Sequence, residues 1–513
     1  MTQFFKKHSD YILLFSNIAI RLLFISFPFW GLEYEDSFIY NDSARSLNHD
    51  YDFHSAFFKT QSCIDGSFES CNESVSYGGH FLTFPLVLSK LNLLIGYNPD
   101  NIFILNFIIS IILLVVVFNW NKRNKDKYLF SLRSFLWIML LTPFITIFQT
   151  SGLAETLSGL FVILTIIFIL KASEFNFKIS NISLWLTFLF LVSAIITKRE
   201  NIVLFALLLI IPIFRAVNKK PPAPRGYFIL LFISVLTVSF FSNYINIFSI
   251  ESNEGADIGT KTFSLTFLFQ NLEQSLLAFT NFKYWGLTGI LFLLSLLIII
   301  VKKSYSQLGV LFLTISLLYI FLYASHYRSY YQVHYNIMFP FETLRYSVTY
   351  LPLIAIFISS INFKELFPGL KIYKRSISIC IFFLSLFLVF NSIKTRIDFS
   401  NDEYFSRISP VVKTLEVVKE SDIIITDLPI VFHCYVSDKQ HVIDFYSLSA
   451  EKLSNLIFDN PKSNVYLIKR KDNPADAQRY NSNIDIQQYC FNLINLEIEN
   501  YELIKFCNNA TKN

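Results

Sequence analysis

Two adjacent carboxylates, Glu35 and Asp36, begin a segment with helical spacing. Asp36, Tyr40 and Ala44 are four residues apart, so on a helix they share one face, and Arg45 follows directly. An ionised carboxylate can accept a proton as a general base, and two neighbouring ones can hold Mg²⁺ or Mn²⁺. The alternative is that both acids only stabilise a helix N-terminus, by about 0.3–1 kcal/mol. The residue types therefore permit chemistry here without requiring it.

The composition indicates that these acids belong to a membrane protein. The 513 residues are 53% hydrophobic and 16% charged, against roughly 25% charged in a soluble domain. A mean hydropathy of +0.47 excludes disordered and disulfide-scaffold classes, and no feature suggests nucleic-acid binding. We therefore predict an α-helical polytopic membrane protein.

Eleven segments have the apolar length of a membrane span, which is about 20 residues. Lys and Arg cluster after the second, fourth, sixth, eighth and tenth segments, which places those ends in the cytoplasm and the chain after residue 395 outside. This predicts a multi-pass protein of the cytoplasmic (inner or plasma) membrane. The spans lie near 11–30, 101–119, 135–150, 152–170, 182–198, 201–216, 227–247, 284–301, 307–324, 346–361 and 377–393.

Two parts of the chain depart from a simple bundle of spans. The outer segment 31–100 is long for a connecting loop, and its stretch Phe81–Gly96 is apolar but shorter than a span, which predicts a helix on the membrane surface. Residues 400–513 alternate helical and strand patterns, with strands at Ile423–Thr426, Val442–Phe445 and Val465–Lys469 and a hairpin near 492–507. We predict a transmembrane module over 1–395 and a small extracytoplasmic α/β domain over 400–513.

Several short motifs together resemble the GT-C superfamily of membrane glycosyltransferases, which use polyprenyl-phosphate sugars. The segment Asp36-x-x-x-Tyr40-x-x-x-Ala44-Arg45 is similar to their acidic motif, although Ser37 stands where a second acid often follows. The other motifs are the segment from His80 to Pro85, Ala154-Glu155-Thr156-Leu157, Thr197-Lys198-Arg199-Glu200 and Arg345-Tyr346 with Pro352. Their order agrees with the family over residues 10–360, and the nearest branch includes lipid A aminoarabinose transferases and protein mannosyltransferases.

The resemblance implies an enzyme that moves a sugar from a polyprenyl phosphate to an envelope glycan, lipid or protein acceptor on the outer face of the membrane. Asp36 would be the general base of an inverting displacement, with Glu35 beside it. Donor and phosphate binding are expected at His80, Glu155, Lys198, Arg199, Arg328 and Arg345, and substrate binding at Tyr40, Tyr331 and His334. Glu35 and Asp36 are also the candidate ligands of Mg²⁺ or Mn²⁺.

Several of these positions have a structural alternative. Glu155 stands near a helix start, where the dipole favours a negative charge, and Lys198 can snorkel from a helix end to the interface. Arg345 can pair with Glu342, and the tyrosines around Tyr331 can form an interfacial aromatic belt. A transporter or a catalytically inactive scaffold that binds lipid-linked sugars would explain the same pattern.

The cysteines predict local bridges in outer segments. Cys63 and Cys71 lie eight residues apart in the first outer segment and either bridge in an oxidising compartment or remain free thiols. Cys490 and Cys507 can pair across the terminal hairpin, which would leave Cys434 without a partner.

Overall fold

The computed structural model describes part of the 513-residue chain in two compact units. Unit 1 comprises Met1–Pro28, Phe81–Phe84 and Phe103–Ile397, and unit 2 comprises Phe29–His80, Pro85–Ile102 and Asp398–Asn513. The described residues are 2–30, 36–49, 83–124, 130–142, 147–217, 224–245, 265, 267–269, 271–272, 279–302, 307–325, 341–361, 374–436, 441–445, 450–459, 463–470, 489–496, 498 and 500–507.

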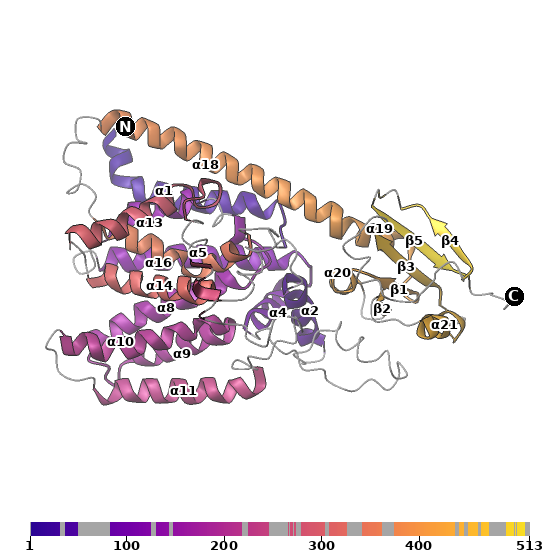
Figure 1. Ribbon diagram of the computed structural model, residues 1–513, viewed down its shortest axis with the longest axis horizontal. Coiled ribbons are helices and arrows are strands. Elements are labelled where there is room, and N and C mark those ends of the chain that lie inside the picture. Colours follow the sequence, from indigo (N-terminus) through magenta and orange to yellow (C-terminus); the bar gives the residue numbers. More distant parts are fainter. Residues whose placement is uncertain are drawn as a thin grey trace. The chain divides into compact units, whose positions relative to one another are not determined.

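Unit 1 is helical, and every predicted span overlaps a helix. The helices are α1 (Thr2–Ile25), α5 (Asn101–Arg123), α6 (Leu132–Leu141), α8 (Glu155–Glu174), α9 (Ile182–Thr197), α10 (Val203–Val217), α11 (Arg225–Ile245), α13 (Phe282–Lys302), α14 (Gln307–Ala324), α16 (Phe341–Ser359) and α18 (Lys374–Glu403). The short 3₁₀ helix η2 (Arg199–Ile202) joins α9 to α10. Within the unit, α8 lies beside α9 and α16, and α16 lies beside α14 (Figure 1). Helix α16 also contacts α6.

Within the described residues, three helices are long and apolar enough to cross a membrane: His8–Ile25, Asn101–Arg123 and Glu155–Glu174. The other apolar helices are shorter, so a count of eleven crossings stays a prediction. One clear difference from the predicted boundaries is in the third span, because α6 ends at Leu141 instead of residue 150. Thr142 adopts an extended backbone before Pro143, and proline disfavours helix at the residue that precedes it.

Unit 2 contains a five-stranded sheet in the order β2-β1-β3-β5-β4. The strands are β1 (Ile423–Thr426), β2 (His441–Asp444), β3 (Val465–Arg470), β4 (Phe491–Ile494) and β5 (Tyr501–Phe506). β1 pairs in parallel with β2 and β3, whereas β5 pairs antiparallel with β3 and β4. The predicted strands are therefore confirmed to within a residue or two, and Cys490 and Cys507 form a disulfide across the terminal hairpin, as predicted.

The core of the sheet is built from alternating apolar side chains and one amphipathic helix. Ile423 and Ile425 of β1 pack with Leu467 of β3 and with Leu453 and Ile457 of α21 (Ala450–Asp459). The helix α20 (Pro429–Tyr435) connects β1 to β2, and α19 (Ser409–Val417) precedes β1 after a short π-helix, η4 (Tyr404–Ile408).

The remaining helices of unit 2 come from the first predicted outer segment. They are α2 (Asp36–His49) and α4 (Thr83–Ile95), which confirms the helix expected from Phe81 to Gly96. Asn48 of α2 bonds to Ser89 of α4, with Ser89 Oγ 2.7 Å from Asn48 Oδ1. Whether α4 lies on a membrane surface stays a prediction.

Candidate functional site

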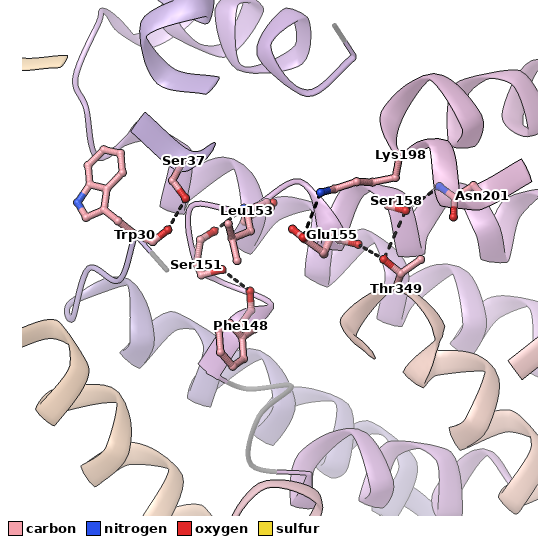
Figure 2. A network of polar contacts seen from close by, with 11 residues as sticks. Trp30, Ser37, Phe148, Ser151, Leu153, Glu155, Ser158, Lys198, Asn201 and Thr349 are labelled. Carbon is pink, nitrogen blue, oxygen red and sulfur yellow. Dashed lines mark hydrogen bonds and ion pairs between the residues drawn. The ribbon is translucent and has the colours of Figure 1, made fainter. Parts of the chain in front are cut away.

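An ion pair between two buried side chains is the centre of the candidate site in unit 1. Lys198 Nζ lies 3.2 Å from Glu155 Oε1, and the two side chains are 9% and 2% exposed respectively (Figure 2). Charges attract more strongly in such surroundings than in water because the dielectric screening is weaker. The carboxylate thereby holds an ammonium in place, and an anionic ligand such as a phosphate can bind to an ammonium so placed.

Both partners of this ion pair stand at helix ends. Glu155 is the first residue of α8, where the helix dipole favours a negative charge. Helix α9 ends at Thr197, and Lys198 has an extended backbone, with φ of −151° and ψ of 121°, before η2 begins at Arg199. This break in the helix carries the Lys198 side chain toward Glu155 (Figure 2).

Four tyrosines from α14 and α16 stack beside the ion pair. Lys198 Nζ lies 5.7 Å from the ring centroid of Tyr346, within the range of a cation–π interaction. Tyr346 stacks on Tyr323 with 4.8 Å between centroids, and Tyr350 stacks on Tyr319 at 5.8 Å. The lysine thus has an acidic partner and an aromatic neighbour, both held by packed helices.

A hydrogen-bond network at Asn201 fixes the chain after Lys198. Asn201 Nδ2 donates to Ser158 Oγ of α8 at 2.8 Å and to the Ala194 carbonyl of α9 at 2.7 Å. Tyr319 Oη of α14 donates to Asn201 Oδ1 at 2.6 Å. Because these bonds reach three helices, η2 is tied to α8, α9 and α14.

A glycine permits the close approach of α8 and α16. A Cβ atom at Gly159 would lie 3.3 Å from the carbonyl oxygens of Val348 and Thr349. Small residues at helix crossings let backbones come together, as is common within membranes. The crossing brings α8, which begins with Glu155, against α16, which carries Tyr346.

In unit 2, α2 places the acidic motif at the start of a buried helix. Asp36 is its first residue, while Tyr40 and Ala44 are 1% and 0% exposed, so the predicted helix is confirmed. Ser37 Oγ donates to the Trp30 carbonyl, and the Trp30 ring stacks on Phe38 with 4.4 Å between centroids. These contacts fix the first turn of α2, and Figure 2 shows the bond from Ser37 to Trp30.

Side chains near α2 donate hydrogen bonds to the last carbonyls of α20, and these bonds hold the two helices together. Arg45 Nη1 donates to the carbonyls of His433, at 3.1 Å, and Val436, at 2.5 Å. Tyr97 Oη donates to the Cys434 carbonyl at 2.7 Å, and Arg45 lies 5.2 Å from the Tyr97 ring centroid. A cation at a helix C-terminus also interacts favourably with the dipole. Residues far apart in the sequence thus hold α2 and α20 together.

Burial shifts the titration of the side chains at this contact. The pKa of His433 is lowered from its usual 6.5, first by burial and then by Arg45, whereas Asp42 and a backbone hydrogen bond to Val442 oppose the shift. Burial also raises the pKa of the Cys434 thiol, whose Sγ lies 3.2 Å from the Phe38 carbonyl oxygen. A buried thiol of raised pKa is unreactive, so Cys434 has a packing role.

The other predicted site residues are not tested by any described contact. Glu35, His80, Arg328, Tyr331 and His334 lie outside the described residues. Asp36, Arg199 and Arg345 belong to described helices, but their side chains do not belong to the described part. The predicted Cys63–Cys71 bridge is likewise outside it. Of the predicted set, the structure therefore brings Glu155 and Lys198 together.

Sequence reasoning missed two buried arginines that contact the segment before Glu155. Arg21 of α1 and Arg396 of α18 are both 0% exposed. Arg21 stands inside the first predicted span, and an ionisable residue within a span is a signal for a functional or structural polar site. Arg396 lies just beyond the last predicted span, where hydropathy alone gives no signal.

A metal ion at Glu35 and Asp36 stays a prediction. The described residues contain no group of three or more His, Cys, Asp or Glu that could hold a metal ion. Glu35 and the side chain of Asp36 lie outside the described part of the chain.

Comparison with protein-family models and with curated proteins finds no match. Solved structures do match: ArnT from Cupriavidus metallidurans bound to undecaprenyl phosphate is 9% identical, with a TM-score of 0.58, over 98% of this chain and 99% of that chain. The same protein in the apo state is 10% identical, with a TM-score of 0.55, at the same coverage.

These likenesses define the class of fold. The chain has the GT-C fold, as the motifs around Asp36 and Glu155 predicted. Its neighbours include ArnT, an aminoarabinose transferase. The match spans nearly the whole of both chains, and together with the apolar helices it supports a location in a membrane.

Proposed function

We propose that this chain is a membrane glycosyltransferase that moves a sugar from a polyprenyl-phosphate donor to an envelope glycan, lipid or protein acceptor. The observation that carries the proposal is the buried Glu155–Lys198 ion pair in a chain of GT-C fold. One structural neighbour holds undecaprenyl phosphate, which supports a polyprenyl-phosphate ligand for this chain.

Lys198 is the residue best placed to bind the donor phosphate. A phosphate cannot enter hydrocarbon cheaply, so the cation that receives it has to be preorganised near the interface. Glu155 holds the ammonium before the donor arrives, and the phosphate then competes with the carboxylate for it. Arg199 directly follows Lys198, and Arg345 directly precedes Tyr346, whose ring lies next to the Lys198 ammonium. We assign both arginines to the same phosphate, together with His80 and Arg328.

Asp36 is the general base of the proposed reaction. An acceptor hydroxyl attacks the anomeric carbon, its oxygen forms the new glycosidic bond, and the bond between that carbon and the donor phosphate oxygen breaks. The polyprenyl phosphate leaves as an anion, and the hydroxyl proton passes to the Asp36 carboxylate. A single displacement inverts the anomeric centre. Tyr40, Tyr331 and His334 would contact the sugar or the acceptor.

The orientation and the metal belong to the same proposal. From the charge pattern, we infer that the catalytic residues and residues 400–513 lie on the outer face of the cytoplasmic membrane. Glu35 and Asp36 would hold Mg²⁺ or Mn²⁺, which would supply positive charge near the leaving phosphate. A chelator should then abolish transfer, and a chelator-resistant wild type would remove the metal from the proposal.

The test is transfer by purified protein in detergent or lipid vesicles. Polyprenyl-phosphate sugars differing in the sugar are supplied with acceptors extracted from a deletion strain, and the released polyprenyl phosphate is measured. Transfer by the wild type and a much slower but measurable transfer in Lys198→Met support the enzyme. Binding without turnover supports an inactive scaffold, and donor movement across a sealed vesicle without sugar transfer supports a carrier.

A further inference from the structure

The segment before Glu155, Ile147–Ala154, is irregular and fully buried. Its first two residues, Ile147 and Phe148, are helical, and turns and bends follow until α8 begins at Glu155. Backbone carbonyls that are buried in such a segment need hydrogen-bond donors, and within a membrane irregular backbone occurs only where protein or a cavity surrounds it. The identity of those donors therefore shows what holds Glu155 in place.

Arg396 of α18 supplies donors from one guanidinium. Its Nη1 donates to the Ile147 carbonyl at 2.7 Å, and its Nη2 donates to the Thr150 carbonyl at 3.2 Å. Its Nε donates to the Phe27 carbonyl at 2.8 Å, just after α1. A planar guanidinium fork can reach three carbonyls at fixed angles, which a lysine ammonium cannot reproduce.

Arg21 of α1 binds the same segment through Gln149. Its Nε and Nη2 donate to Gln149 Oε1 at 3.1 and 2.6 Å, and its Nη1 donates to Asn17 Oδ1 at 3.0 Å. The Gln149 carbonyl in turn accepts a bond from Thr156 Oγ1, at 2.9 Å, in the first turn of α8. Arg21 is thus connected to the residue that directly follows Glu155.

Asn106 of α5 completes the set of donors. Its Nδ2 donates to the carbonyls of Ser151 and Leu153, the latter at 2.8 Å. Five backbone carbonyls of the segment therefore accept hydrogen bonds from side chains. Helix α18 supplies the donors for residues 147 and 150, α8 the donor for residue 149, and α5 the donor for residues 151 and 153. Few rearrangements of the segment keep all of these bonds.

We propose that Arg21 and Arg396 are positioning residues, which hold Ile147–Ala154 so that Glu155 meets Lys198 in the geometry needed for transfer. Burying a charge in a membrane bundle is expensive, and well-packed apolar residues would join the helices at lower cost. The guanidinium groups instead fix the irregular segment that leads to Glu155. The expected effect of the arginines on turnover rests on the proposed function. Their expected effect on the order of the segment Ile147–Ala154 does not.

The experiment compares Arg396→Lys, Arg396→Met, Arg21→Lys and Arg21→Met with the control Arg133→Lys. Arg133 is half-exposed, and its Nε lies 3.4 Å from Asp10 Oδ1. Hydrogen exchange followed by mass spectrometry is read over residues 147–160, and turnover is measured in parallel. We expect local exchange to rise about tenfold in Arg396→Lys while other peptides keep their rates, because the fold persists.

Turnover should fall by about 10²-fold in Arg396→Lys, since misplacing a reacting group by about 1 Å has that effect. Because Arg396 acts through the ion pair, adding Arg396→Lys to Lys198→Met should lower turnover little further. If Arg396 only stabilised the fold, Arg396→Lys would lower turnover by the same factor with Lys198 or Met at position 198. Hydrogen exchange would then become faster in all peptides.

The exchange measurement separates this inference from the proposed function. If the wild type transfers no sugar, the proposed function fails, while local exchange at 147–160 still shows whether the arginines hold the segment. Unchanged exchange over 147–160 in both methionine variants would overturn the positioning role, whatever the activity. Should Arg396→Lys and Arg21→Lys keep full turnover, positioning for transfer would likewise be wrong.

Discussion

Glu155 and Lys198 place opposite charges 3.2 Å apart, at the first residue of α8 and directly after the last residue of α9. Two charges taken out of water are expensive, and their attraction offsets that cost only while both are present. An apolar pair would join these helices with less desolvation, so the charges suggest a ligand that uses one of them.

A double-mutant cycle at this ion pair should separate stability from activity. Glu155→Gln or Lys198→Met alone should destabilise the protein by about 3–5 kcal/mol, because each leaves a buried charge uncompensated. The double variant Glu155→Leu/Lys198→Met should recover most of that stability without recovering transfer. Unfolding in detergent and donor turnover measure the two effects.

The control for the cycle is the partly exposed pair Lys469–Glu502, whose charged atoms lie 2.9 Å apart across β3 and β5. Its disruption should cost less than about 1 kcal/mol, as is usual for exposed pairs. Full transfer by the double variant at Glu155 and Lys198 would contradict the assignment of Lys198 to the donor phosphate.

The contact between α2 and α20 should depend on Arg45. Arg45→Met removes the charge-assisted bonds to the His433 and Val436 carbonyls, at a cost of about 1.5–3 kcal/mol. We expect faster protease cleavage next to α2 and lower turnover. Tyr97→Phe, which loses one neutral bond to Cys434, should have the same effects to a smaller degree. Equal protease resistance in Arg45→Met and the wild type would show that α2 is held without it.

The stability of the protein should fall in mild acid because of His433. Its folded pKa lies below the unfolded value of 6.5, mainly through burial, so the unfolded chain takes up more protons as the pH drops. The stabilising contribution of the neutral imidazole is complete above the unfolded pKa and is lost as the pH falls toward the folded pKa. The melting temperature should therefore drop between about pH 7.5 and about pH 5.5, and drop less in His433→Gln. Parallel pH profiles for the two proteins would rule out this histidine as the cause.

Hydropathy and turn chemistry predict the helices and strands of this chain well. Ile423–Thr426 is a run of four β-branched residues, all of them buried, and it forms β1 as expected. The predicted third span extends too far because apolar residues continue past Pro143, although the helix has ended at Leu141. Apolar content indicates burial, but it does not indicate where a backbone must turn.

Part of the candidate site follows from the sequence, and the rest depends on tertiary contacts. Glu155 and Lys198 stand in recognisable motifs at predicted helix ends, and the structure pairs them. Arg45 was part of a motif, yet its partner His433 is 388 residues away, and no local pattern specifies such a contact. The roles of Arg21 and Arg396 likewise arise from carbonyls of a segment that only the fold brings to them.

The charge pattern predicts that residues 400–513 lie outside the cytoplasm. Lys and Arg that flank short loops stay on the cytoplasmic side, which with eleven spans puts the carboxyl end outside. A phosphatase that is active only outside the cytoplasm, fused after Asn513, should be active. An inactive fusion, together with an active cytoplasmic reporter at the same site, would reverse the topology.

The most direct test of the proposed chemistry is Asp36→Asn. The change keeps the size of the first residue of α2 and removes its basicity, so the protein should fold and bind donor. A general base contributes roughly 10²–10⁴-fold, and transfer should fall by at least the lower figure. Glu35→Gln should cost less if Glu35 only supports the helix end, and about as much if the two acids share a metal. If Asp36→Asn kept most of the transfer rate while Glu155→Gln or His80→Ala abolished it, the base would have to be assigned to another residue.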